Sequence, residues 1–534
     1  MAEPRANLSS RALPVGVGLV VLYVVLVFGA YRVLGSNELT TLPIAKRLLD
    51  PTVYVRDWFY GAPPLPRLPF AYLVSPLTLL GPLPVVALVL RVVGWAVLAW
   101  ALARVWARLE LRVVWWVPIM AVYFGLGQSL FAGEWLFKWI ESKVFAYAAV
   151  FFGLSWALDR RWTRSGLALG LAGSAHALVG GWSAVSAVAA AWVARRPLEP
   201  RWGRWFLAIG AGASVGLALA LTILLEPAPP LGLRDPAWIY VHFRNPHHID
   251  PFAFDWNAVR IAGSLAITAH AAHRAWRGPS GPVRFVAAFV VASMLIAAFG
   301  IAVAFVPGGE RILRFYPFRV GPSAGLLLSL GLIALDLQRL VEARWPRAFA
   351  PSTARRAVLP WGPTAILLAL AVPTFGARLS NFLEFPAGAT IGGPAQTRPF
   401  HDVTAWLRER SPRDAMLIAP PGLLEVAVLS ERSMPVSFKG VPAGKAGLLE
   451  WYRRLVDFNG GVEPEARGFD AAREIDARFA ALPVEAYLEL ADAYDGDLLL
   501  IPNRDDVDLP ILYRNAGWTV YALTSTSAVD RDRR

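Results

Sequence analysis

The chain has 534 residues, of which 56% are hydrophobic and 17% charged, and its mean hydropathy is +0.46. This composition excludes an ordinary soluble domain and predicts a protein with many membrane spans. The 22 tryptophans agree with this interpretation, because tryptophan favours both membrane–water interfaces. The sequence has no cysteine, which excludes disulfides, thiolate chemistry and cysteine-bound metals.

The formal net charge of +13 is unevenly distributed along the chain. Residues 377–534 carry 18 basic and 23 acidic side chains, a net charge of −5, so residues 1–376 carry the remaining +18. The basic residues of that first part mostly flank apolar segments. They therefore indicate membrane topology and contacts with lipid headgroups, and they argue against a nucleic-acid partner.

The apolar segments, taken in chain order, predict about 11 transmembrane helices within residues 1–376. Several segments are shorter than the ~20 residues of a full crossing, and the pair around His176–Trp182 could instead form a re-entrant hairpin. The predicted spans are Leu13–Leu34, Val85–Ala107, Val113–Leu130, Val144–Leu158, Gly166–Leu178, Gly181–Ala194, Trp205–Leu225, Ala258–Ala275, Phe285–Val306, Val320–Leu340 and Val358–Gly376.

Arginine clusters fall in alternate loops between these spans, and this alternation predicts the side of the membrane on which each loop lies. The N-terminus and the clusters are assigned to the cytoplasm, and the C-terminal region to the extracytoplasmic side of a bacterial plasma (inner) membrane. The clusters are Arg104, Arg108 and Arg112; Arg160, Arg161 and Arg164; Arg195, Arg196, Arg201 and Arg204; Arg274, Arg277 and Arg284; and the stretch Arg339–Arg356.

The chain changes character after Arg378, where charged residues become frequent. Residues 377–399 are rich in proline and glycine and predict a linker, and residues 400–534 predict a soluble extracytoplasmic α/β domain. Short apolar runs alternate there with helical patterns. The apolar runs are Ala415–Ala419, Pro435–Phe438, Leu498–Ile501 and Trp518–Leu523, and the helical patterns are Ala446–Phe458, Phe469–Leu482 and Val484–Tyr494.

The first outer loop, residues 36–84, begins SNELTTLPIAKRLLDPTVYVRDWFYG and holds three carboxylates: Glu38, Asp50 and Asp57. Acids beside a bilayer are costly unless a cationic or catalytic group uses them. This loop is therefore the predicted active-site loop. Asp57 has a second interpretation as a helix cap, and Asp50, directly before Pro51, is interpreted as a turn residue.

The second outer loop reads GEWLFKWIESKVFAY and places Glu134 and Lys138 four residues apart, the spacing of an ion pair on one helix face. The alternative is a solvated interfacial helix that Trp135 and Trp139 anchor in the membrane surface. His176, a single histidine among small residues, is interpreted as structural.

The third charged loop contains HFRNPHHIDPFAFD, in which His247, His248 and Asp250 could bind a divalent metal. The spacing matches no strong zinc pattern, so a hydrogen-bonding wall for a polar ligand is preferred to a metal site. Arg244 is a candidate phosphate contact. No cofactor is therefore predicted, and a divalent cation stays open as an alternative.

The fourth outer loop, PGGERILRFYPFRVGP, interleaves Arg311, Arg314 and Arg319 with aromatic residues. Planar guanidinium groups bind phosphate oxygens in a bidentate manner that lysine cannot match. These arginines are therefore candidate phosphate ligands, with anchoring to lipid headgroups as the alternative.

The first outer loop and the helix that follows it resemble those of the GT-C glycosyltransferases. A first span ends at Asn37-Glu38, where the family carries an acidic pair, and a long loop with a further Asp follows. The resemblance covers the first ~110 residues well. The rest of the chain shares only the architecture, which is many spans followed by an outer α/β domain. The chain also resembles bacterial GT-C-like membrane proteins of unassigned activity. The matching positions of the next stretch are Pro63, Pro64, Leu65, Tyr72, Leu80, Gly81 and Arg91.

This resemblance implies a GT-C-like transmembrane domain over residues 1–376 that transfers a hexosyl or pentosyl group at the outer face of the membrane. The implied partners are a polyprenyl-phosphate-linked sugar donor and membrane lipids. Glu38 is the first candidate general base and Asp57 the second. The candidate substrate-binding residues are Arg91, Glu134, Lys138, Arg244, His247, His248, Asp250, Arg311, Arg314 and Arg319.

Two other classes of function stay open: a transporter or flippase of a lipid-linked substrate, and a non-catalytic scaffold. A transporter would show ionisable residues at mid-span and a repeat between its halves. The sequence has few charged residues at mid-span, and no repeat is apparent in it. The enzyme hypothesis predicts that Glu38, Asp57, His248 and Arg314 line one outward cavity.

Overall fold

The computed structural model describes residues 12–35, 37–227, 234–278, 281–344, 361–386 and 397–523. The chain forms two compact units, each assembled from three separate stretches of sequence. Unit 1 comprises Met1–Tyr31, Leu90–Leu221 and His247–Arg378, and unit 2 comprises Arg32–Val89, Thr222–Pro246 and Leu379–Arg534. The first outer loop and the C-terminal region therefore belong to the same unit.

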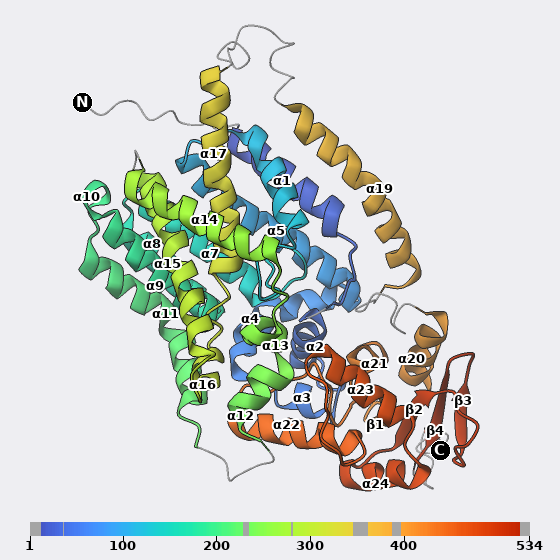
Figure 1. Cartoon of the computed structure of the whole chain (residues 1–534). Helices are drawn as coiled ribbons and strands as arrows, with labels where there is room; N and C mark the ends of the chain where they lie inside the picture. Colours follow the sequence, from blue (N-terminus) through green and yellow to red (C-terminus); the bar gives the residue numbers. More distant parts are fainter. Residues whose placement is uncertain are drawn as a thin grey trace. The chain divides into compact units, whose positions relative to one another are not determined.

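Unit 1 is a bundle of apolar helices (Figure 1), and a helix occupies each of the predicted spans. These helices are α1 (Ala12–Phe28), α5 (Leu83–Arg108), α6 (Trp116–Gly125), α7 (Ser142–Leu158), α8 (Trp162–Ala175), α9 (Ala177–Val193), α11 (Trp202–Leu224), α14 (Ala258–Arg277), α15 (Gly281–Val303), α17 (Leu326–Arg344) and α19 (Gly362–Glu384). Short helices between them are α10 (Arg195–Leu198), α13 (Pro246–Ile249) and α16 (Glu310–Leu313), with 3-10 turns at Val113–Trp115 and Pro251–Ala253 and a π-helical turn at Gly321–Gly325.

Five helices in the described part of the chain are long and apolar enough to cross a membrane: α5, α11, α15, Gly321–Arg344 and α19. Helices α1, α6, α7 and α9 and the segment Leu65–Leu80 are apolar but shorter. Large apolar side chains such as Leu207, Leu340 and Leu370 lie exposed on the bundle, where only lipid would cover them favourably. The chain is therefore a multi-pass membrane protein, and the count of eleven crossings stays a prediction.

Glycine allows α8, α9 and α11 to approach one another backbone to backbone, and Figure 1 shows them side by side. A Cβ on Gly180 of α9 would lie 2.0 Å from the Gly173 nitrogen of α8, and a Cβ on Gly216 of α11 would lie 2.3 Å from the Gly173 oxygen. Small residues at helix interfaces are the usual means of close packing within membranes. The His176 region thus forms two helices joined at His176.

Unit 2 contains a four-stranded sheet in the order β1-β2-β4-β3. β1 pairs parallel with β2, and β4 pairs antiparallel with both β2 and β3. Three of the four apolar runs form strands, whereas Pro435–Phe438 does not, and the short β3 lies outside them. The strands are β1 (Leu417–Ile418), β2 (Leu498–Pro502), β3 (Ile511–Arg514) and β4 (Trp518–Ala522), and the helices after Thr397 are α20 (Arg398–Arg410), α21 (Leu424–Ser430), α22 (Lys445–Phe458), α23 (Phe469–Ala480) and α24 (Val484–Tyr494).

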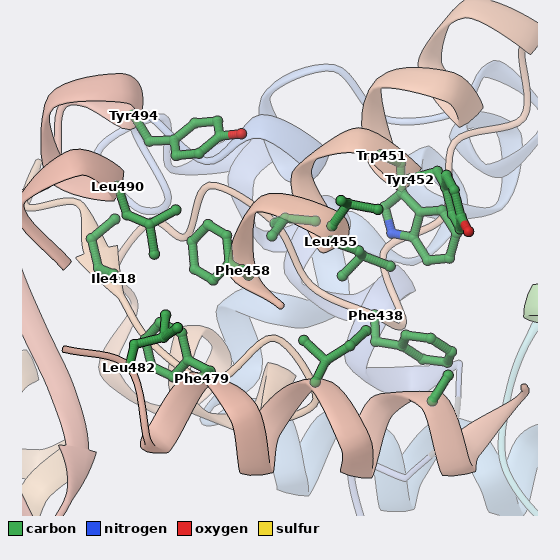
Figure 2. Close-up of a cluster of buried hydrophobic side chains, with 14 of the residues drawn as sticks. Ile418, Phe438, Trp451, Tyr452, Leu455, Phe458, Phe479, Leu482, Leu490 and Tyr494 are labelled. Atoms are coloured by element: carbon green, nitrogen blue, oxygen red, sulfur yellow. The ribbon is translucent and has the colours of Figure 1, made fainter. Parts of the chain in front are cut away.

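The core of unit 2 joins segments that are far apart in sequence. Aromatic and aliphatic side chains of α22, α23 and α24, including Phe458, Phe479 and Leu490, gather against Ile418 of β1 (Figure 2). Ile239 and Phe243, which lie in a π-helical turn at Ile239–Arg244 within the stretch 222–246, belong to the same core. The other elements of this unit are α2 (Glu38–Leu49), α3 (Trp58–Gly61), α4 (Leu68–Val74) and α12 (Pro236–Trp238), with 3-10 turns at Leu65–Arg67 and Ser75–Leu80.

The stretch 377–399, which the sequence assigns to a linker, begins as helix. α19 continues to Glu384, and residues 387–396 lie outside the described residues. Residues 1–11 and 345–360, which hold the N-terminus and most of the last arginine cluster, also lie outside them.

Candidate functional site

Glu38 is the first residue of α2, directly after the N-cap position Asn37. Its side chain is fully buried, and its Oε2 atom accepts a hydrogen bond of 3.2 Å from the Gly35 nitrogen. A carboxylate at a helix N-terminus is favoured by the helix dipole. The carboxylate of the predicted base therefore lies at the start of a helix, where a nearby backbone N–H group binds it.

Asp57 is the N-cap of α3, as the alternative interpretation of the sequence predicts. Its Oδ1 atom accepts from the backbone nitrogens of Phe59 (3.0 Å) and Tyr60 (2.8 Å), and its Oδ2 atom accepts from that of Met434 (3.0 Å). The side chain is 5% exposed, and its burial raises the pKa to about 6 although the three N–H groups act to lower it. Both carboxylate oxygens thus hold backbone in place.

Other polar contacts fasten the first outer loop to the C-terminal part of unit 2. Lys46 pairs with Glu431 at 2.5 Å, and Arg56 pairs with Asp497 at 2.7 Å. The Arg56 nitrogen also donates to the Ser433 hydroxyl at 2.9 Å. Residues 37–61 are therefore an integral part of unit 2.

The contribution of Asp57 to stability should depend on pH, because the pKa of this group rises from 3.8 in the unfolded chain to about 6 in the fold. The folded state binds the proton more tightly, so the stability that this group contributes is present below pH 4 and is lost as the pH rises through 6. This difference between the folded and unfolded pKa corresponds to about 3 kcal/mol. We expect the thermal unfolding midpoint of the wild type to fall, relative to that of Asp57→Asn, between pH 4 and pH 7.

Comparing the wild type with Asp57→Asn separates the titration of Asp57 from that of two other buried acids. Burial likewise raises the pKa values of Glu425 and Asp476 to about 7, and both groups titrate in wild type and variant alike. A difference between the two midpoints that stays constant from pH 4 to pH 7 would contradict the prediction.

The strongest concentration of buried charge in the described part of unit 1 joins the second and fourth outer loops. Glu134 is 2% exposed and Lys143 is 3% exposed, and their charged atoms lie 3.1 Å apart. Lys143 also pairs with Glu141 at 2.8 Å, and Arg319 lies 3.5 Å from the other oxygen of Glu134. Two carboxylates and two cations thus form one cluster, which we call the ionic cluster.

Aromatic rings and histidines surround the ionic cluster. The Lys143 ammonium lies 3.5 Å from the ring centre of Trp135, and the Arg319 guanidinium lies 4.2 Å from that of Tyr316. Arg319 Nη1 donates to His176 Nε2 at 3.4 Å, so the histidine interpreted as structural touches the cluster. The Nε atom of Arg319 is buried and has no hydrogen-bond partner among the described residues.

Electrostatics keep the cluster charged inside the protein. Burial alone would raise the pKa of Glu134, but Arg319 and Lys143 outweigh it and hold that pKa well below its ordinary value. Burial would lower the pKa of Arg319, whereas Glu134 raises it above its ordinary value. Burial lowers the pKa of His248 to about 4, so this ring is neutral at pH 7.

The backbone of the second outer loop explains why Glu134 meets Lys143. Residues 126–141 are not helical, and Gln128, Ala132 and Gly133 have positive φ angles of 69°, 64° and 58°. The Gln128 side chain accepts from the nitrogens of Leu136 and Phe137 and so fixes the turn. The interfacial helix and the helical i, i+4 spacing expected for Glu134 and Lys138 are therefore wrong.

The surroundings of Lys138 differ from those of His247 and His248. The Lys138 ammonium lies over the rings of Trp139 (4.7 Å) and Tyr31 (5.5 Å). His248 Nδ1 lies 2.7 Å from the Ala132 oxygen, and the rings of His247 and His248 are 4.1 Å apart. His248 thus borders the loop that carries Glu134.

Three predicted substrate-binding residues form hydrogen bonds with the backbone. Buried Arg91 donates to the carbonyl oxygens that follow α1, at 2.8 Å for Tyr31. Arg244 donates to the Phe438 oxygen at 3.0 Å. Asp250 accepts from the Phe252 nitrogen at 3.0 Å and caps a 3-10 turn.

The remaining predicted arginines, Arg311 and Arg314, lie in or directly after α16, where Arg311 is exposed and Arg314 stacks on Phe315 at 5.2 Å. Glu38 and Asp57 belong to unit 2, and His248 and Arg314 belong to unit 1. In the described part of the chain, no group of three His, Asp or Glu side chains converges as a metal site.

Lys143, Glu141 and His176 are not among the candidate residues that the sequence predicts. Lys143 and Glu141 were visible as further charges in the second outer loop, next to the start of an apolar helix. His176 carried no signal beyond being a histidine between two apolar segments.

A family model described as "Domain of unknown function (DUF6798)" matches residues 398–458, which contain α20, β1, α21 and α22. The comparison with curated proteins found no match.

Among solved structures, the chain is similar to the arabinofuranosyltransferase AftD from mycobacteria, with 16% identity and a TM-score of 0.50 over 98% of this chain and 42% of AftD. It also matches the oligosaccharyltransferase AglB from Archaeoglobus fulgidus at 12% identity. The apo form has a TM-score of 0.48 over 93% of this chain and 70% of AglB. The complex of AglB with an inhibitory peptide and a dolichol-phosphate has a TM-score of 0.47 over 92% of this chain and 69% of AglB. The similarity to AftD is one of fold, and it confirms the GT-C resemblance at that level.

Proposed function

We propose that this chain is a membrane glycosyltransferase of the GT-C type that takes its sugar from a polyprenyl-phosphate-linked donor. The observation that carries the proposal is the ionic cluster of Glu134, Glu141, Lys143 and Arg319 in a GT-C-like fold. Buried charges are expensive beside a bilayer, and they are commonly functional there.

The position of the cluster supports a lipid-borne substrate. Lys143 is the second residue of α7, and Arg319 lies two residues before the apolar segment Gly321–Arg344. Both cations therefore lie at the ends of apolar helices, at the depth where the phosphate of a membrane lipid would be found. The unpartnered Nε of Arg319 is a donor that a phosphate oxygen would satisfy.

The chemistry of sugar transfer suggests roles for several of these groups. In sugar transfer, an acceptor hydroxyl attacks the anomeric carbon, the bond from that carbon to the phosphate oxygen breaks, and the polyprenyl phosphate leaves. Cations stabilise the charge that develops on the leaving phosphate, and we assign this role to Arg319 with Glu134 and His176 orienting it. Glu38 accepts the proton of the acceptor hydroxyl. Asp57, whose oxygens hold backbone, positions the loop of Glu38 rather than acting as a second base.

The topology proposed with this function has eleven spans in a bacterial inner membrane. The N-terminus is cytoplasmic, and the C-terminal α/β domain is extracytoplasmic. The alternation of the arginine clusters supports this orientation.

We expect Glu38→Gln to lower sugar transfer at least 100-fold, because a positioned base contributes about 10²–10⁴ in rate. The assay uses purified protein in lipid with undecaprenyl-phosphate-linked hexose or pentose as donor and an octyl glycoside as the hydroxyl acceptor. It measures the undecaprenyl phosphate that is released and the sugar that is joined to the acceptor. Asp50→Asn is the matched control, because Asp50 lies in the same loop and forms a turn with the Thr52 nitrogen. Donors that the wild type leaves intact, or a Glu38→Gln variant with wild-type release, would contradict the proposal.

A further inference from the structure

Helix α14 exposes several large apolar side chains and buries apolar side chains against the protein. Val259, Ile261 and Leu265 are exposed, whereas Ile267 and Ala271 are buried. The first three turns of the sequence AVRIAGSLAITAHAAHRAWR are largely apolar, and the last two hold two histidines, two arginines and a tryptophan. A helix of this kind has its outer face in lipid and its basic end at the membrane surface.

The basic end of α14 is joined by an arginine of α15. Arg274 pairs with Asp336 of α17 at 3.1 Å, and His270 pairs with the other oxygen of Asp336 at 2.9 Å. Arg284 of α15 donates to the Gly278 oxygen at 3.4 Å, which brings its guanidinium group to the end of α14. Arg277, between them in sequence, is exposed. We call Arg274, Arg277 and Arg284 the basic patch.

The charges of the basic patch exceed what the described protein neutralises. Among the described residues, Asp336 is the carboxylate that pairs with the basic patch. The three arginines together with this aspartate therefore carry a net charge of +2. The buried Nε atoms of Arg274 and Arg284 have no hydrogen-bond partner in the part of the chain that the structure describes. The helix dipole favours cations at the end of α14, but it does not satisfy these donors.

Trp276 identifies the kind of ligand. Its side chain is 84% exposed between Arg274 and Arg277, although tryptophan is costly to expose to water. An indole ring beside guanidinium groups suits the boundary of acyl chains and headgroups, where the ring lies at headgroup level and the cations meet phosphate.

We infer that the basic patch and Trp276 form a binding site for an acidic phospholipid, whose phosphate accepts hydrogen bonds from Arg274 and Arg284 and whose net negative charge is also attracted by Arg277. The site is independent of the proposed sugar transfer, because it shares no residue with the ionic cluster.

The test is native mass spectrometry of the full chain in detergent with equal amounts of phosphatidylglycerol and phosphatidylcholine. The wild type should retain phosphatidylglycerol preferentially. Arg277→Gln should reduce that preference about fivefold, and the double variant Arg277→Gln with Arg284→Gln about 25-fold, because each basic residue near an acidic lipid surface contributes a factor of about five. Arg274 stays in place to keep its pair with Asp336.

Arg260→Gln is the matched control, because Arg260 lies on the same helix at the opposite end, 3.5 Å from Asp255. The control variant should keep the wild-type preference. Retention of both lipids in the supplied ratio by the wild type would overturn the inference. An equal loss in Arg260→Gln would also overturn it, since it would show a general effect of surface charge.

Discussion

Replacing Lys143 with methionine should lower the free energy of unfolding by about 3–5 kcal/mol, the usual cost of removing one partner from a buried ion pair. Lys143 contacts both Glu134 and Glu141, so the variant leaves two buried carboxylates with Arg319 as the remaining cation of the ionic cluster. Thermal unfolding followed by tryptophan fluorescence measures the loss.

Two further variants separate charge balance from the loss of side-chain contacts. Lys138→Met, in the same loop, removes a cation over the rings of Trp139 and Tyr31 and should cost about 1 kcal/mol or less. Adding Glu141→Gln to Lys143→Met restores one carboxylate per cation and should recover part of the stability. Equal losses in Lys138→Met and Lys143→Met, or no recovery in the double variant, would show that the ionic cluster does not act through its charge.

Gly180→Ala should destabilise the bundle by about 3 kcal/mol, at the upper end of the usual cost of overpacking. The new Cβ would lie 2.0 Å from the Gly173 nitrogen and 2.3 Å from the Gly173 Cα, and backbone atoms cannot move aside as a flexible side chain can. Helices α8 and α9 would have to separate. The thermal midpoint in lipid or detergent measures the effect.

The neighbouring glycine provides the control. A Cβ on Gly181 would meet no atom within 4 Å, so Gly181→Ala should leave stability unchanged or raise it by up to about 1 kcal/mol through helix propensity. If both substitutions destabilise the protein equally, the close approach of α8 and α9 is not what Gly180 provides.

Local sequence signals predicted much of this structure, because they depend on near neighbours. Apolar runs were sufficient to locate the helices of unit 1, and three- and four-residue periodicity located α22, α23 and α24. The capping alternative for Asp57 is also local, since two of its three hydrogen bonds reach only Phe59 and Tyr60.

The partners of the candidate site could not be predicted in the same way. The spacing of Glu134 and Lys138 suggested a helical pair, but positive φ angles at Ala132 and Gly133 turn the loop and bring Glu134 to Lys143. Arg319 comes from another loop, far along the chain. Likewise, the Met434 nitrogen that binds Asp57 lies 377 residues away in sequence.

Hydropathy along the chain is enough to predict a helical multi-pass membrane protein, the places of its helices and the loops in which charge is concentrated. Hydropathy and periodicity carry that information, because the bilayer and the helix act on contiguous residues. The fold was needed to show that the loop of Glu38 belongs to the same unit as the C-terminal region, and that Lys143 and Arg319 both contact Glu134. Those pairings depend on how distant segments pack, and burial, rather than sequence spacing, makes each buried charge require a partner.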